Sequence, residues 1–247
     1  MTSLPPWTDG PGPLVGVIGG VGPQATAYFL DMVVRLTQAD RDQDHLDMVV
    51  LDHASIPDRT AFILGTSTDD PGPVMADDAR RLAAFGAAFL VLPCNTAHHF
   101  TQEIEAAVEI PLVSIVAETV AEVVRRVGTP RAVGLLATTG TVRAAVYQDS
   151  LAAVGAQAVL PDEREQAALM RIIYEQVKAG RPVDVPAFHG LVGSLRERGA
   201  QAVVLGCTEL SVVAADLDLL AADRALVDSL DVLARRTIER AGRRVRG

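Results

Sequence analysis

The chain has 247 residues, a length that fits one large α/β domain or two small ones. It is 49% hydrophobic, and its 22 basic and 31 acidic residues give a net charge of −9. These values exclude a disordered chain, and the acidic balance argues against nucleic acid or an anionic membrane as a partner. Two cysteines exclude a scaffold built on disulfides. We therefore expect a protein that binds a small molecule.

The first 13 residues are rich in proline and glycine and lack the pattern of a signal peptide, so we expect a flexible lead-in (residues 1–13) and a cytoplasmic protein. Beyond them, short apolar runs alternate with helical patterns, as at 23–36, 74–85 and 163–178. This alternation is typical of an α/β fold whose parallel sheets are covered by helices on both faces. The expected strands are 14–18, 48–52, 89–92, 111–114, 132–136, 158–160, 202–205 and 225–227.

The sequence also repeats itself. Residues 86–94 align without a gap to residues 199–207, and a cysteine ends each of these segments. The period is far too long for a solenoid, so it predicts two similar α/β lobes related by a pseudo-twofold axis, with a cleft between them. We place the first lobe at residues 14–117 plus 229–247 and the second lobe at residues 118–228.

Cys94 and Cys207 are the cysteines that end the two repeated segments, and each lies at the expected carboxyl end of a strand. Asn95 and Thr96 follow the first cysteine, and Thr208 follows the second. A helix that begins there is expected to lower the pKa of each thiol through its dipole. A lone cysteine is usually a small buried hydrophobic residue, but two cysteines at equivalent places indicate chemistry.

Two thiols on opposite walls of one cleft suit one reaction in particular. One thiol takes a proton from a carbon atom while the other delivers a proton to the opposite face, which inverts a stereocentre without redox chemistry. Because an α-hydrogen is a very weak acid, the developing negative charge needs preorganised hydrogen-bond donors. Asn95, Thr96, Thr208 and the backbone N–H groups beside them are placed to hold a carboxylate in this way.

With these motifs the chain resembles the aspartate/glutamate racemase family of cofactor-independent amino-acid racemases, and within it the aspartate racemases most closely. The resemblance covers nearly the whole chain after the lead-in, and the matching segments come in the expected order. Pro-Cys-Asn-Thr-Ala-His at 93–98 and Gly-Cys-Thr-Glu at 206–209 are its most specific parts. The other matching segments are 17–26, 54–59, 133–141 and 173–180.

The resemblance implies that Cys94 and Cys207 are acid/base thiols acting on opposite faces of the α-carbon of aspartate, with glutamate or another amino acid as the alternative. It implies no cofactor, no metal and a homodimer. Arg59 and Lys178 match the basic pair that family members place near the distal carboxylate of the substrate. Val21 replaces a methionine that is frequent in the family, which leaves the shape of the pocket floor open. The residues expected to bind the α-carboxylate and the amino group are Asn95, Thr96, Thr138, Thr141 and Thr208.

Two other enzyme classes remain as alternatives. Gly20, Gly22 and Ala25 follow a strand and fit a dinucleotide-binding fingerprint, but Pro23 removes an N–H group that a pyrophosphate would need. A pyridoxal-phosphate enzyme would need Lys178, the only lysine of the chain, as its Schiff base. Either alternative leaves the paired cysteines without a role.

A metal site or a binding protein would use the same cleft differently. Cys94, His98, His99 and Cys207 could in principle form a thiolate–imidazole site, although we expect His98 to pack or hydrogen-bond near Cys94 instead. A sensor or carrier would bind an acidic amino acid without turning it over, and it has no need of two thiols. The loop at 65–73 is expected to be a surface loop, with closure over the substrate as the alternative.

Overall fold

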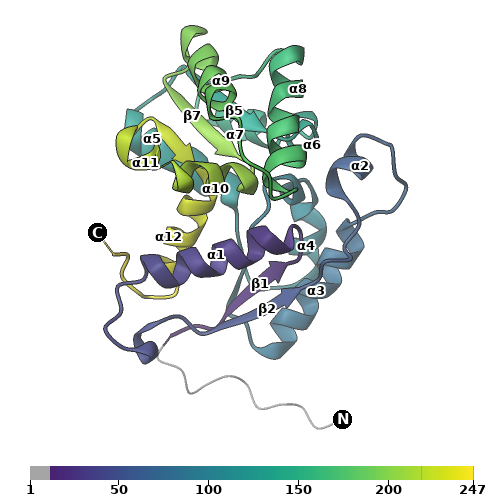
Figure 1. The fold of residues 1–247 in the computed structure, drawn as a ribbon. Helices are drawn as coiled ribbons and strands as arrows, with labels where there is room; N and C mark the ends of the chain where they lie inside the picture. The colour runs from purple at the N-terminus through teal and green to yellow at the C-terminus, as the bar shows by residue number, and fades with distance from the viewer. Residues whose placement is uncertain (1–11, 218, 247) are drawn as a thin grey trace.

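The computed structural model describes residues 12–217 and 219–246, so most of the expected lead-in lies outside the described residues. Two parallel four-stranded sheets form two lobes (Figure 1), as the repeat predicts. The first sheet has the order β2-β1-β3-β4 and the second has the order β6-β5-β7-β8, so equivalent strands occupy equivalent places. The strands are β1 (Val15–Gly19), β2 (Met48–Asp52), β3 (Phe89–Val91), β4 (Leu112–Val113), β5 (Ala132–Ala137), β6 (Gln157–Val159), β7 (Ala202–Gly206) and β8 (Leu226–Asp228).

Every expected strand is present, and its ends lie within one residue of the prediction. Helices join the strands and cover the sheets, and among the described residues none has the length and apolar character needed to cross a bilayer. The helices are α1 (Pro23–Leu36), α2 (Arg59–Ile63), α3 (Gly72–Phe85), α4 (Thr101–Ala107), α5 (Ile115–Val127), α6 (Thr139–Arg143), α7 (Val146–Ala153), α8 (Glu163–Arg171), α9 (Val185–Glu197), α10 (Thr208–Asp216), α11 (Leu219–Ala222) and α12 (Ser229–Arg240). Short 3₁₀-helices, η1 (Asp42–Asp44) and η2 (Thr96–Phe100), and a π-helix, η3 (Ile172–Val177), complete them.

Local capping explains where the central helices begin. Ser114 accepts a hydrogen bond from the N–H group of Ala117 at the start of α5, and Asp228 accepts one from Leu230 at the start of α12. Each bond satisfies an N–H group that has no partner within the helix. Asp228 also accepts a hydrogen bond from Ser211, and burial raises the pKa of its carboxyl group to about 7.

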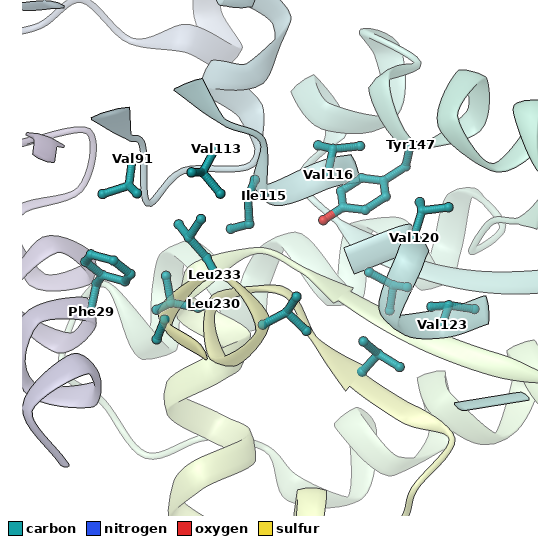
Figure 2. Packing of buried hydrophobic residues seen from close by; sticks show 14 of the residues in the cluster. Phe29, Val91, Val113, Ile115, Val116, Val120, Val123, Tyr147, Leu230 and Leu233 are labelled. Atoms are coloured by element: carbon teal, nitrogen blue, oxygen red, sulfur yellow. The ribbon is translucent and has the colours of Figure 1, made fainter. Parts of the chain in front are cut away.

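The largest hydrophobic cluster is shared by both lobes. It contains buried side chains from β1, β3 and β4 of the first sheet and from β5, β7 and β8 of the second, together with α1, α5, α7 and α12. Figure 2 shows Val91 and Val113 on one side of this cluster, Leu233 of α12 next to Val113, and Val120 and Tyr147 on the other side. Because burial of apolar surface dominates stability, this cluster fixes the two sheets relative to each other.

The helix pair α5 and α12 lies where the lobes meet. Helix α12 packs against α5 and α1, and it also contacts β4 of the first sheet and β7 and β8 of the second. The sequence places the boundary between the lobes after residue 117, which lies inside α5. The division of the chain into a first lobe at 14–117 plus 229–247 and a second lobe at 118–228 stays a prediction.

Glu122 adds an ionic contact between the two helices of this pair. Burial acts to raise the pKa of Glu122, but hydrogen bonds from Arg125 and Arg126 lower it to about 2. Arg236 of α12 lies 3.5 Å from the Glu122 carboxylate and 3.2 Å from that of Glu118. Glu122 therefore carries a negative charge at neutral pH and is compensated by three arginines.

Replacing Leu233 with alanine should lower the free energy of unfolding by about 2–5 kcal/mol, because the change leaves a cavity in the shared cluster. The side chain of Leu233 is fully buried. Chemical denaturation measures the change, with Val34→Ala as a control, since Val34 is 49% exposed and its truncation should cost less than about 0.5 kcal/mol. Equal losses of unfolding free energy in the two variants would contradict the role of α12 in holding the shared cluster together.

Candidate active site

A pocket lies between the lobes, at the carboxyl ends of β3 and β7. Its wall includes both cysteines and all of the other expected site residues except Thr141. The expected residues that line it are Arg59, Cys94, Asn95, Thr96, Thr138, Lys178, Cys207 and Thr208. Val21, Asp58, Thr60, Tyr174 and Glu209 also line the pocket and were not expected as binding residues.

The two cysteines reach this pocket from equivalent strand ends. Cys94 comes shortly after β3, and its N–H group donates a 2.8 Å hydrogen bond to the carbonyl of Leu92. Cys207 follows β7 directly and is the N-cap residue of α10. The two residues are 8% and 5% exposed, so both cysteines lie almost out of contact with solvent.

The expected lowering of the thiol pKa by a helix N-terminus is wrong for Cys207. Burial raises the pKa of the Cys207 thiol well above its usual value, and the negative charge of Glu209 raises it further. The Cys207 Sγ donates a 2.9 Å hydrogen bond to Glu209 Oε2. Desolvation and a neighbouring carboxylate both oppose a thiolate, and together they outweigh the dipole of α10.

Glu209 connects Cys207 to Lys178. Lys178 Nζ lies 3.2 Å from Glu209 Oε1 and 4.9 Å from the ring centroid of Tyr174. Burial acts to lower the pKa of Lys178, but the charge of Glu209 makes the net shift upward, so the lysine stays protonated. Glu209 stands in the Gly-Cys-Thr-Glu segment, two residues after the cysteine, and this spacing was the available sequence signal for it.

A π-helix places Tyr174 and Lys178 in the pocket wall. The helix expected at 163–178 is an α-helix only to Arg171, and it continues as η3 from Ile172 to Val177. The N–H group of Lys178 donates to the carbonyl of Ile173, five residues back. Such wide turns are frequent at functional sites.

Three threonine hydroxyl groups form a closed triangle between the lobes. Thr96 Oγ1 lies 3.0 Å from Thr138 Oγ1 and 2.8 Å from Thr141 Oγ1, and the last two atoms are 3.0 Å apart. Thr96 begins η2, which follows β3 of the first sheet, whereas Thr138 and Thr141 lie at the start of α6, which follows β5 of the second sheet. Thr141 is fully buried behind the pocket wall and contacts the pocket through its two partners.

Asn95 is held by two residues that were not expected at the site. Its side-chain Nδ2 donates a 3.0 Å hydrogen bond to Ser229 Oγ, and its Oδ1 accepts a 2.6 Å hydrogen bond from the Tyr147 hydroxyl. Burial raises the pKa of Tyr147, so the phenol remains protonated and can donate this bond. These contacts join segments far apart in the chain and fix the amide beside Cys94.

His98 supports the backbone of Cys94 and uses both ring nitrogens. Its Nδ1 lies 2.8 Å from the carbonyl oxygen of Cys94, and its Nε2 accepts a 3.1 Å hydrogen bond from the N–H group of Ile115. Burial lowers the pKa of His98 to about 4, so the ring is neutral and Nδ1–H is the donor to Cys94. The expected hydrogen bond near Cys94 is therefore present. Among the described residues no group of three or more His, Cys, Asp or Glu side chains could hold a metal ion.

In the glycine turn after β1, the backbone of Gly20 lies close to the backbone of His53. Gly20 has a φ angle of 81°, and a Cβ atom there would lie 2.2 Å from the carbonyl carbon of His53. The N–H group of Gly20 donates a 3.0 Å hydrogen bond to Thr26 Oγ1, so it is not available to a phosphate. The turn thus gives no support to the dinucleotide-binding alternative.

Helix α2 of the first lobe lines the pocket and packs against α6 of the second lobe. A Cβ atom on Gly140 would lie 2.6 Å from Thr60 Oγ1 and 3.0 Å from the Thr60 Cα, so the close contact requires glycine. Arg59 Nη1 donates to the carbonyl groups of Pro57 and Ile56, while its buried Nε has no hydrogen-bond partner among the described residues. The residues of the loop at 65–73 do not line the pocket, and its last two residues already belong to α3.

The space inside the pocket is small. It measures about 30 Å³, whereas ligand pockets usually hold roughly 300–1,000 Å³. An amino acid therefore needs the walls to move apart, and both the contact between α2 and α6 and the hydrogen bond between Thr96 and Thr138 join the two lobes there.

Comparisons with known proteins agree with this architecture. The sequence model of the Asp/Glu/hydantoin racemase family matches residues 18–237. A broad-specificity amino-acid racemase, RacX of Bacillus subtilis, is 29% identical over 232 residues, which are 91% of this chain and 96% of that one. The aspartate racemase of Picrophilus torridus has a TM-score of 0.80 at 27% identity, covering 95% of this chain and 96% of its own.

An aspartate racemase homologue from Pyrococcus horikoshii has a TM-score of 0.73 at 27% identity, covering 92% of this chain and 98% of its own. The match to the family model extends over most of the chain, and these relatives are covered almost completely. The chain is therefore an enzyme of the racemase class. It belongs to the Asp/Glu/hydantoin racemase family.

Removing the imidazole of His98 should flatten part of the pH dependence of stability. The pKa of His98 falls from 6.5 to about 4 on folding, so the unfolded chain binds more protons between these values, and the wild type loses about 3 kcal/mol as the pH falls from 6.5 to 4. His98→Gln should lack this loss. Urea denaturation of both proteins across this range measures the difference, and parallel curves would show that His98 is not neutral in the folded protein.

Proposed function

We propose that the protein racemises an acidic amino acid, aspartate in preference to glutamate, by a two-thiol acid/base mechanism without a cofactor. The observation that carries the proposal is a single pocket lined by one cysteine from each lobe. Cys94 and Cys207 follow equivalent strands of two sheets related by the repeat, so they approach a bound substrate from opposite walls. One thiol removes the α-proton and the other donates a proton to the opposite face.

The α-carboxylate gains negative charge as the α-proton leaves, and the pocket offers it neutral hydrogen-bond donors. The Asn95 amide has a second N–H to donate, whereas the hydroxyl groups of Thr96 and Thr138 bond within the threonine triangle and that of Thr208 donates to Glu209, so these three turn to the carboxylate when it binds. The N-terminus of α10 adds backbone N–H groups beside Cys207. Preorganised donors of this kind stabilise an enolate without reorganisation during the reaction.

Arg59 is the residue best suited to bind the distal carboxylate of aspartate. Its guanidinium group lines the pocket, and the buried Nε lacks a partner among the described residues. A buried unsatisfied donor costs free energy unless a ligand satisfies it. Lys178 lies in the same pocket, but its charge is already compensated by Glu209.

The relatives leave room for other substrates. RacX carries broad specificity in its name, and the Picrophilus torridus protein is named an aspartate racemase, so the reaction type is better supported than the side chain. A binding protein without catalysis would have no use for a second thiol, and a pyridoxal enzyme would need Lys178 free of Glu209. The homodimer that the resemblance implies remains part of the proposal.

Replacing either cysteine with alanine should abolish racemisation, because each thiol supplies one of the two proton transfers. Proton NMR in heavy water with L-aspartate and D-aspartate measures both the loss of the α-hydrogen signal and the appearance of the other enantiomer. Wild type should do both. Cys94→Ala and Cys207→Ala should each fall by at least about 10²-fold in inversion. Tight binding without exchange, unchanged in both variants, would support a sensor instead.

Replacing Arg59 with glutamine should raise the KM for aspartate by about ten- to a hundredfold, because a charge-assisted hydrogen bond to the distal carboxylate is lost. Racemisation of alanine, which has no distal carboxylate, should be affected much less. Arg80→Gln is the matched control, since the side chain of Arg80 is 57% exposed on α3. An equal loss of racemisation with aspartate and with alanine would show that Arg59 does not bind the distal carboxylate.

A further inference from the structure

The two thiols of the pocket have different surroundings. The Cys207 Sγ donates to Glu209 Oε2 at 2.9 Å, and Glu209 Oε1 lies 3.2 Å from Lys178 Nζ. In the described part of the chain, the hydrogen bonds of Cys94 are made by its backbone, which donates to Leu92 and accepts from His98. A pair of pseudo-symmetric strands thus presents one thiol that is bound to a carboxylate and one that is not.

We propose that Glu209, paired with Lys178, keeps Cys207 protonated in the resting enzyme, so that Cys207 is the proton donor and Cys94 the proton acceptor when a substrate first binds. This inference rests on the proposed racemisation and assigns a direction to it. Lys178 acts on Cys207 through Glu209.

The charge balance of the group explains this assignment. Glu209 and Lys178 together are neutral, so a neutral thiol at the buried Cys207 adds no net charge to the group. A thiolate at Cys207 would place two negative charges about 3 Å apart with a single cation to compensate them, which is unfavourable at low dielectric. The other titratable groups that act on Cys207 are the phenols of Tyr147 and Tyr174, and both are neutral.

For the first enantiomer, each proton transfer pairs one bond broken with one bond formed. The Cys94 thiolate forms an S–H bond with the α-hydrogen, and the electron pair of the broken C–H bond enters the enolate of the α-carboxylate. The Cys207 S–H bond then breaks, its electron pair stays on sulfur, and the proton bonds to the opposite face of the α-carbon. Cys94 is left as a thiol and Cys207 as a thiolate. Water returns the resting state by protonating Cys207 and accepting the proton of Cys94 when product leaves.

The thiolate at Cys207 is therefore a short-lived state that Lys178 stabilises. Its ammonium group is close enough to Glu209 to respond to the charge created on sulfur, and its position over Tyr174 keeps it in the pocket wall. Removal of Glu209 should favour the Cys207 thiolate, because the opposing carboxylate is lost and the cation remains. Removal of Lys178 should disfavour it for the opposite reason.

The test uses alkylation of Cys207 by iodoacetamide as a function of pH, in full-length protein carrying Cys94→Ala so that one thiol remains. Adding Glu209→Gln should move the midpoint of alkylation down by about 1 pH unit or more, and adding Lys178→Met should move it up. Glu163→Gln, an exposed change in the first turn of α8, is the control and should leave the midpoint unchanged. Shifts of the same sign, or none, in the two variants would overturn the proposal.

Kinetics with both cysteines present separates this inference from the proposed function. Racemisation has an equilibrium constant of one, so kcat/KM is the same for both enantiomers in every variant, but Glu209→Gln should change the ratio of the two kcat values by tenfold or more. An unchanged ratio of the kcat values in Glu209→Gln, with no shift in alkylation, would overturn the proposal. A wild type that exchanges no α-hydrogen would overturn the proposed racemisation itself. If Glu209→Gln does not fold, Lys178→Met with its alkylation shift carries the test alone.

Discussion

The packing of α5 and α12 against both sheets is the constraint on which the pocket depends. Each cysteine is fixed to the end of a strand, so the two sheets decide how the thiols face each other. Leu233 of α12 lies in the cluster that joins the sheets, and Ser229 at the start of the same helix accepts a hydrogen bond from Asn95. Ser229 also donates to the carbonyl of Leu205 in β7. A single helix therefore ties the segment after Cys94 to the strand that precedes Cys207.

The two halves of the molecule share a strand order and differ in the helical segment that begins after each thiol. After Cys94 the chain forms a 3₁₀-helix in which neutral His98 binds the cysteine carbonyl. After Cys207 it forms an α-helix whose first turn carries Glu209. Similar scaffolds with different local charges give the two thiols different electrostatic surroundings, which a reaction that adds and removes protons on opposite faces can use.

The strands and the paired cysteines were predictable, because apolar runs and a repeated cysteine are local properties of the sequence. The π-helix was not, since η3 continues the apolar pattern of α8 without a break. The contact of Glu209 with Lys178 depends on the packing of η3 against α10. The spacing of residues along the sequence does not predict this packing. The dipole argument failed for Cys207 because burial and a carboxylate two residues away are stronger than the helix N-terminus.

The path of the chain sets an order for its folding. The last described residues return to the first lobe, where Val245 pairs with Thr37 and the N–H group of Arg246 donates to Leu36. Domains usually fold as they leave the ribosome, beginning with the N-terminal one. Here each sheet is built from one continuous stretch of the chain, but α12, which follows the last strand of the second sheet, packs against α1 and β4 of the first lobe. The first lobe is therefore completed only after the second sheet has been synthesised.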